Sequence, residues 1–162
     1  LVGSEMCIRD RCLTLLLAVG VFGTTVSAAI NDDDTGNITV TGVEDNGVTV
    51  SVSAYQVMTV NFNTTNQQPE EPVYSWKTEV AEWVRTNYPD YIGIDDSVKE
   101  DFSGASVADI ATFYDALAAA IKGNTITLTV KGNTTVSGVA TGTIDNLPMG
   151  AYLILIEGGT HV

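Results

Sequence analysis

The side chains that could act as nucleophiles, bases or metal ligands are few in this chain of 162 residues. The single histidine is His161, and the two cysteines are Cys7 and Cys12. A serine or cysteine nucleophile needs a histidine or another base within hydrogen-bond reach. A zinc site needs a cluster of cysteine and histidine ligands. We therefore predict no catalytic residues, no metal site and no cofactor, and we do not expect an enzyme.

Carboxylates are the one reactive group that the chain has in quantity, with 20 Asp and Glu residues. Two carboxylates flanking a sugar linkage would be enough for glycoside hydrolysis. Most of the acids gather in polar, loop-like segments, and only Glu157 lies beside an apolar run in the later part of the chain. A secreted hydrolase would need an acid pair in a cleft lined by aromatic side chains such as Trp76 or Trp83. We keep this class as an alternative that the placement of the two tryptophans will test.

The net charge of −13, from 7 basic and 20 acidic residues, limits the kind of partner that the protein can have. Binding to a phosphate backbone requires a basic surface, so we expect no nucleic acid partner. The hydrophobic fraction of 44% is too high for a disordered acidic tail. Composition therefore predicts an acidic globular domain.

The N-terminal region has the pattern of an export signal. Residues 12–22 form an apolar run too short to span a membrane, and Val26-Ser27-Ala28 has the small residues typical of a cleavage site. We predict a signal peptide over residues 12–28 with cleavage after Ala28, and no membrane attachment afterwards. Residues 1–11 resemble a translated sequencing adapter at the end of a metagenomic gene fragment, and we interpret them as an artefact.

The first half of the remaining chain alternates between polar and apolar residues, as half-buried strands do. After a polar lead-in over residues 29–35, we expect a strand over 36–43 and a tight hairpin turn at Asn46-Gly47. A longer strand should follow, with residues 63–72 as a loop behind it. One face of that strand is apolar apart from Gln56, and its members are Val48, Val50, Val52, Ala54, Met58, Val60 and Phe62.

Helical spacing replaces this alternation in the middle of the chain. Ser75 is positioned to cap a first helix, which Pro89 should end. After an acidic connector over residues 91–104, Ser106 and Asp109 resemble a capping box, and Gly123 supplies a stop for the second helix. The apolar stripes of both helices are typical of faces that pack on a sheet.

Alternation returns after the helices, at residues 125–131, 134–144 and 151–157. The last of these strands is apolar on both faces, which predicts a central strand covered on both sides. Leu147-Pro148-Met149-Gly150 lacks the threonine of a sortase sorting signal and should form the turn before it. The predicted fold is mainly β, an antiparallel β-sandwich with a two-helix insertion, in a domain over residues 36–162.

Four segments together resemble the N-terminal domain of sortase-assembled pilin backbone subunits of Gram-positive bacteria, the SpaA-like isopeptide-forming family. They are ITVTGVEDNGVTVSVSAYQVM, VAEWVRTNYPDYIG, FYDALAAAIKG and NLPMGAYLILIE. The resemblance covers residues 36–162 and implies an Ig-like, CnaB-type domain. It also implies that a sortase and other pilin subunits are partners, through parts of the protein beyond this segment.

Members of that family often carry an isopeptide bond between a lysine on the first core strand and an asparagine on the last, assisted by a buried acid. In this chain Gln56 occupies the position of the lysine, and Glu157 lies one residue away from the position of the acid. An amide is not a nucleophilic amine, so we predict no isopeptide bond. The four lysines, Lys77, Lys99, Lys122 and Lys131, are expected to be solvated charges.

The family's polymerising lysine lies in a Tyr-Pro-Lys-Asn segment, and Asn87-Tyr88-Pro89-Asp90 has an aspartate where that lysine would be. We expect the true segment, the later domains and the sorting signal to lie beyond Val162, so that the domain is truncated. The expected function is that of a structural pilus subunit, secreted and displayed on the cell wall, with a role in adhesion. The alternative is a domain of a non-polymerising adhesin that binds a host or matrix ligand.

Overall fold

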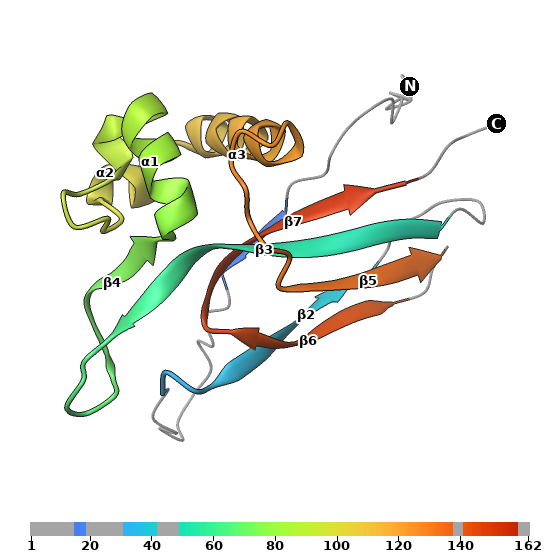
Figure 1. Ribbon diagram of the computed structural model, residues 1–162, viewed down its shortest axis with the longest axis horizontal. Coiled ribbons are helices and arrows are strands. Elements are labelled where there is room, and N and C mark those ends of the chain that lie inside the picture. Colours follow the sequence, from blue (N-terminus) through green and yellow to red (C-terminus); the bar gives the residue numbers. More distant parts are fainter. Residues whose placement is uncertain (1–14, 19–30, 42–48, 138–140, 159–162) are drawn as a thin grey trace, which may run out of the picture.

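The computed structural model describes the backbone of residues 15–18 and all atoms of residues 31–41, 49–137 and 141–158. Within these residues the chain is mainly β, with two antiparallel sheets and a helical insertion between the early and the late strands (Figure 1). The helices cover one face of the larger sheet, and the smaller sheet packs on its other face. The predicted sandwich with a helical insertion is confirmed at this level.

The larger sheet is built around one long strand, β3 (Thr49–Phe62). One edge of β3 pairs with β7 (Gly150–Glu157), which pairs in turn with β1 (Leu15–Ala18). The other edge of β3 pairs first with β5 (Gly132–Ser137) and then with β4 (Pro69–Trp76). Strand β1 lies within the segment predicted as the signal peptide.

The smaller sheet consists of β2 (Thr35–Val40) and β6 (Gly142–Pro148). This arrangement corrects the predicted hairpin, because β2 pairs with β6 and not with β3. Ile38 and Val40 point across the sandwich and pack with Val50 and Val52 of β3. The apolar residues of β2 alternate because one face of this strand packs against the larger sheet. The predicted turn at Asn46-Gly47 lies outside the described residues.

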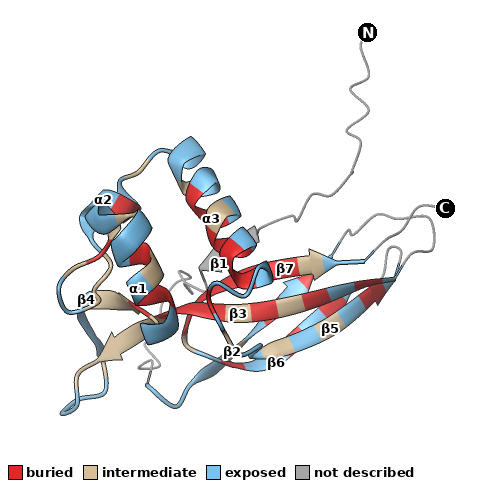
Figure 2. Cartoon of the chain, turned by 45° about the horizontal axis from the view of Figure 1, so that its top comes forward, coloured by how far each residue is buried: buried red, intermediate tan, exposed pale blue. Residues whose placement is uncertain are grey.

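The alternation of β3 is interrupted by a bulge. Val50, Val52 and Ala54 share one face as predicted, which packs against the smaller sheet, and Gln56 is also buried. Figure 2 shows buried and more exposed residues alternating along β3. The register against β7 then shifts between Gln56 and Met58, so one extra residue turns the strand over. Met58 consequently packs in the helical cluster, and the prediction that it shares a face with Val50 is wrong.

The helical insertion begins later than predicted. Residues 69–76 form strand β4, where Ser75 lies opposite Thr59, so the loop predicted over residues 63–72 is too long and Ser75 caps no helix. Helix α1 (Thr78–Asn87) starts after Lys77, whose side chain makes no cap hydrogen bond. The chain then forms the 3-10 turn η1 (Pro89–Tyr91), in agreement with the stop predicted at Pro89.

The connector and the second predicted helix complete the insertion. Residues 100–103 form a short helix, α2 (Glu100–Ser103), so the insertion contains three α-helices where two were predicted. Helix α3 (Val107–Lys122) has the predicted cap, because Ser106 Oγ accepts a hydrogen bond from the Asp109 amide. Its C-cap is Gly123, as predicted.

The later strands differ from prediction at two places. The single strand predicted over residues 134–144 is divided between β5 and β6, which belong to different sheets. Residues 125–131 form no strand, although the Lys131 amide donates to the carbonyl oxygen of Ala54. The apolar residues of this segment alternate because they pack against the helical cluster, where Ile126 is buried and Leu128 is half-buried. Strand β7 is covered on both faces as predicted, with Tyr152 and Ile154 in one hydrophobic cluster and Leu153 and Leu155 in the other.

Candidate functional site

The candidate site is the contact between β3 and the turn that joins β6 to β7, around Gln56. This side chain is 5% exposed and is the one buried polar residue in the described part of the chain. Its Nε2 donates to the carbonyl oxygen of Met149 at 3.0 Å. A buried amide without a partner would carry a desolvation cost of about 1–3 kcal/mol, so this bond holds the turn against β3.

Gly150 allows the turn to approach β3 so closely. Its φ is +154°, a value that residues with a side chain rarely adopt. A Cβ at this position would lie 2.3 Å from the carbonyl oxygen of Met58 and 2.7 Å from Gln56 Nε2. Only a glycine therefore fits between the turn and the buried amide.

Tyr152 fixes the other side of the same turn. It lies opposite Gln56 in the β3–β7 register, and its hydroxyl donates to the carbonyl oxygen of Pro148 at 2.6 Å. Burial raises the pKa of Tyr152 to about 12, because the phenolate would lose its hydration. The residues around Gln56 thus form a rigid, hydrogen-bonded junction.

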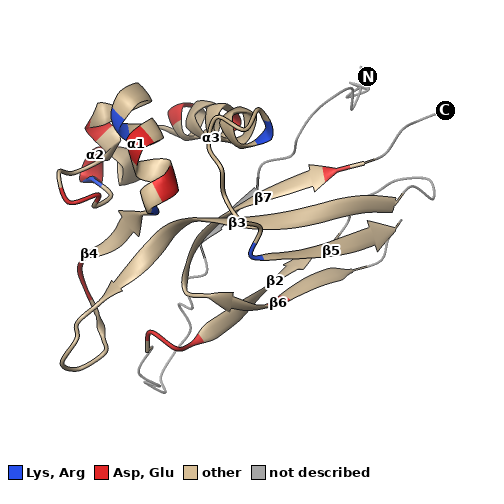
Figure 3. Cartoon of the chain, viewed as in Figure 1, with Lys and Arg blue, Asp and Glu red and all other residues tan. Residues whose placement is uncertain are grey.

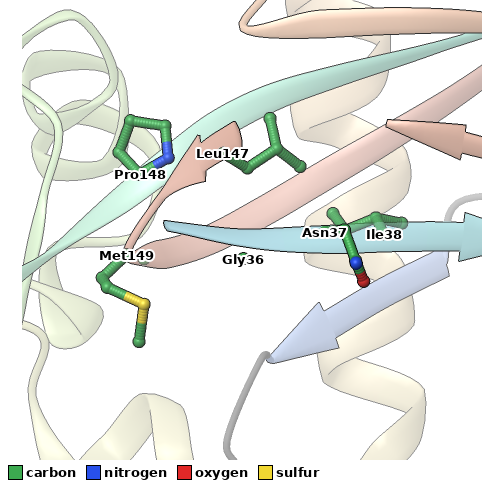
Figure 4. Close-up of a pocket in the computed structure, with 7 residues that line it drawn as sticks. Gly36, Asn37, Ile38, Leu147, Pro148 and Met149 are labelled. Atoms are coloured by element: carbon green, nitrogen blue, oxygen red, sulfur yellow. The ribbon is translucent and has the colours of Figure 1, made fainter. Parts of the chain in front are cut away.

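A shallow hollow lies beside this junction, between the first residues of β2 and the β6–β7 turn (Figure 4). Its volume of about 10 Å³ is that of roughly one water molecule. Ile38 and Leu147 contribute apolar walls, whereas the side chain of Met149 extends away from them. The hollow is too small to hold a substrate.

Gln56 and Glu157, the two residues singled out from the family pattern, are not brought together. Gln56 lies opposite Tyr152 in the register, and Glu157 lies five residues further along β7, opposite Ser51. The side chain of Glu157 is 62% exposed and its carboxylate is 3.8 Å from Lys122 Nζ. The site therefore combines a buried amide with a distant, solvated acid, an arrangement that supports hydrogen bonding and not acyl transfer.

The four lysines lie outside the two core strands. Neither β3 nor β7 contains a lysine. Lys77 precedes α1 and pairs with Glu79 at 3.7 Å. The other three are exposed and lie at Lys99, Lys122 and Lys131.

Seven aromatic side chains, some buried and some half-buried, form a cluster between the helices and the sheet, centred on Phe113. The ring of Phe113 contacts six others, those of Trp76, Trp83, Tyr88, Tyr91, Phe102 and Tyr114. Trp76 is 2% exposed, and its indole nitrogen donates to the carbonyl oxygen of Tyr91 at 3.0 Å. Trp76 is therefore packed inside this cluster, whereas Trp83 is half-buried and contacts the rings of Tyr88 and Phe113.

One buried polar atom has no counterpart in the sequence analysis. The hydroxyl of Tyr114 has no hydrogen-bond partner among the described residues, and burial raises the pKa of this group far above its usual value. The helical stripe indicates that the ring is buried, but it carries no information about a partner for the hydroxyl.

Two searches over the described residues bear on metal and membrane binding. They contain no group of three or more His, Cys, Asp or Glu side chains arranged to hold a metal ion. None of their helices has the length and apolar character needed to cross a bilayer. His161 and the predicted cleavage site at Ala28 lie outside this part of the chain.

The chain was also compared with known proteins. No family model, curated protein or solved structure matches it.

Proposed function

We propose that this chain is a structural domain of a cell-wall-anchored pilus or fimbria of a Gram-positive bacterium, secreted and displayed at the cell surface, where it contributes to adhesion. The domain would take no part in catalysis and would act as an Ig-like, CnaB-type bead in a longer subunit. Its assembly partners would be a sortase and other subunits.

The observation that carries the proposal is the packing of the four segments that resemble the pilin family. Each contributes side chains to the same hydrophobic cluster: Val57 and Met58 from β3, Val80 and Val84 from α1, Phe113 and Leu117 from α3, and Leu153 and Leu155 from β7. Segments separated by long stretches of sequence thus form one structural unit. This packing supports the proposal, because segments that characterise one family of domains should belong to one folded unit.

The distribution of charge supports a surface-displayed domain. Acidic residues gather on the helical insertion and the loops, whereas the strands are almost free of charge (Figure 3). Such a surface favours solubility and keeps like-charged copies apart in solution.

The experiment is an analysis of wall extracts from cells that carry the complete gene. An antibody raised against the domain should detect a ladder of high-molecular-weight species that survives boiling in detergent and disappears when the sortase is deleted. It should also decorate fibres in electron micrographs. A single band of subunit size on the wall would favour the non-polymerising adhesin, and a band found only in the medium would exclude both.

A further inference from the structure

The outer edge of β7 is the feature that the proposed function leaves unexplained. Strand β1 pairs with this edge in antiparallel register, from Leu15 opposite Ile154 to Ala18 opposite Ala151 (Figure 1). β1 belongs to residues 12–28, which the sequence predicts to be removed. Cleavage after Ala28 would therefore take away the strand that the structure places along this edge.

The edge that remains has none of the features that protect natural sheet edges. Such edges usually carry a lysine, a proline or a bulge, each of which blocks further pairing. Residues 150–156 of β7 include no charged residue and no proline, and their register with β1 is regular. Unpaired amide and carbonyl groups along an apolar strand of this kind are a template for another strand.

Both faces of β7 are already covered, which determines what the edge can accept. Leu153 packs in the helical cluster, whereas Tyr152 and Ile154 pack against the smaller sheet. Side chains of an added strand would alternate between the same two layers. Apolar residues would extend both clusters, whereas a charged residue would be desolvated on either side.

We propose that, once the leader is removed, the edge of β7 from Ala151 to Ile154 binds an extended, uncharged, apolar segment of another protein by strand addition. In the precursor, β1 fills the same place from within the chain. A second copy of β7 is a less suitable occupant, because it would bring its own helices and its own smaller sheet to the same edge. The inference rests on cleavage of the leader and does not depend on the pilus proposal.

The test compares the chain with and without its leader. Residues 29–162 and residues 13–162 are produced without export, so that β1 is absent from the first and retained in the second. The probe is a labelled peptide of residues 14–19 with a lysine tag for solubility. The control peptide carries Leu16→Pro, which removes an amide donor and disfavours pairing in a strand.

We expect saturable one-to-one binding of the probe to residues 29–162, at least tenfold weaker binding to residues 13–162, and a comparable loss with the proline peptide. Hydrogen exchange should slow at residues 151–154 and remain unchanged along β4 and β5. Binding raises the melting temperature of residues 29–162, because the peptide binds the folded state.

Several results would overturn the proposal. They are equal binding of the two peptides, equal binding to the two chains, protection confined to another strand, or no binding to a folded chain. A dimer of residues 29–162 paired through β7 that the peptide cannot dissociate would identify a second copy as the occupant and reject a foreign segment. If residues 29–162 do not fold alone, refolding is repeated with each peptide. Rescue by the probe and not by the proline peptide supports the proposal, and no rescue rejects it.

Discussion

At the scale of single residues, the junction around Gln56 shows how one buried amide ties a turn to a core strand. The buried amide donates to Met149 and lies beside a glycine that admits no side chain. No lysine lies on either core strand. The strands are therefore expected to be held together by packing and hydrogen bonds alone.

A mass measurement tests this expectation. The intact mass of the folded protein should equal the mass calculated from its sequence, because neither β3 nor β7 contains a lysine that could form the bond between core strands. A deficit of one ammonia or one water, localised by peptide mapping to a cross-linked pair, would contradict the prediction.

Two buried tyrosines provide a matched pair of substitutions. Tyr152→Phe removes the hydroxyl that donates to Pro148, and we expect a loss of about 0.5–1.5 kcal/mol in the free energy of unfolding. Tyr114→Phe removes a buried hydroxyl without a partner among the described residues, so its effect should be neutral or slightly stabilising. Urea denaturation of both variants measures the difference. A larger loss for Tyr114→Phe than for Tyr152→Phe would contradict the assignment of partners.

The same tyrosines predict a loss of stability at alkaline pH. Burial raises the pKa of Tyr152 to about 12 and raises the pKa of Tyr114 further, whereas both groups have the usual tyrosine pKa of 10.0 in the unfolded chain. Above that value the unfolded state releases protons that the folded state retains, so unfolding becomes more favourable as pH rises. We expect the free energy of unfolding to fall between about pH 10 and pH 12. Tyr152→Phe should reduce the slope, and an unchanged slope in this variant would contradict the argument.

At the scale of elements, some helix and strand boundaries depend on residues close in sequence, whereas others depend on the strands packed beside them. The cap and stop of α3 follow from Ser106, Asp109 and Gly123, all of which act within one turn of the helix, and the sequence predicts them correctly. Strand β4 was missed because Pro69 and Pro72 disfavour strands in general. They are tolerated here because β4 lies at the edge of the sheet, where an amide donor can be absent.

Register is the part of the fold that the sequence could not predict. The alternation of β3 identifies Gln56 as the polar residue on a buried face, but it gives no sign of the bulge that moves Met58 to the helical side. The hydrogen-bond acceptor of Gln56 is a main-chain carbonyl 93 residues away in sequence. Because every residue has such a carbonyl, the residue types in the sequence do not reveal which one accepts this bond. The candidate residue was therefore predictable, whereas its environment was not.

The N-cap of α3 provides a prediction for an element. Ser106→Ala removes the acceptor for the Asp109 amide and should lower the free energy of unfolding by about 1 kcal/mol. Thr127→Ala is the control, because Thr127 is exposed and lies outside the helices, and its effect should stay within about 0.5 kcal/mol. Thermal unfolding followed by circular dichroism distinguishes the two. Equal effects would contradict a specific role for the cap.

At the scale of the whole molecule, the charge of −13 opposes the compact state. Ion pairs offset little of this repulsion, because in each pair of the described part at least one side chain is exposed to solvent. The pairs are Lys77 with Glu79, Arg85 with Asp96 and Lys122 with Glu157. Pairs of this kind contribute about 0–1 kcal/mol each.

Stability should therefore increase with ionic strength. Raising the salt concentration from about 0.01 M to about 0.15 M shortens the screening length from about 30 Å to about 8 Å and weakens repulsion between separated acids. We expect the melting temperature to rise by several degrees over this range, measured by calorimetry in sodium chloride. Sucrose at equal osmolality is the control for effects that do not involve charge. A melting temperature that falls or stays constant in salt would contradict the prediction.

The pairing of β3 with β7 also has a consequence for the order of events during synthesis. Val52 lies opposite Ile156, a separation of 104 residues along the chain. Pairing over such a distance carries a large loop-closure cost and is slow compared with helix formation. While the ribosome is still translating residues 53–149, β3 lacks the strand that pairs with it from Ser51 to Thr59. A nascent chain of this protein should therefore remain open until β7 emerges, which would suit the export that the proposed function requires.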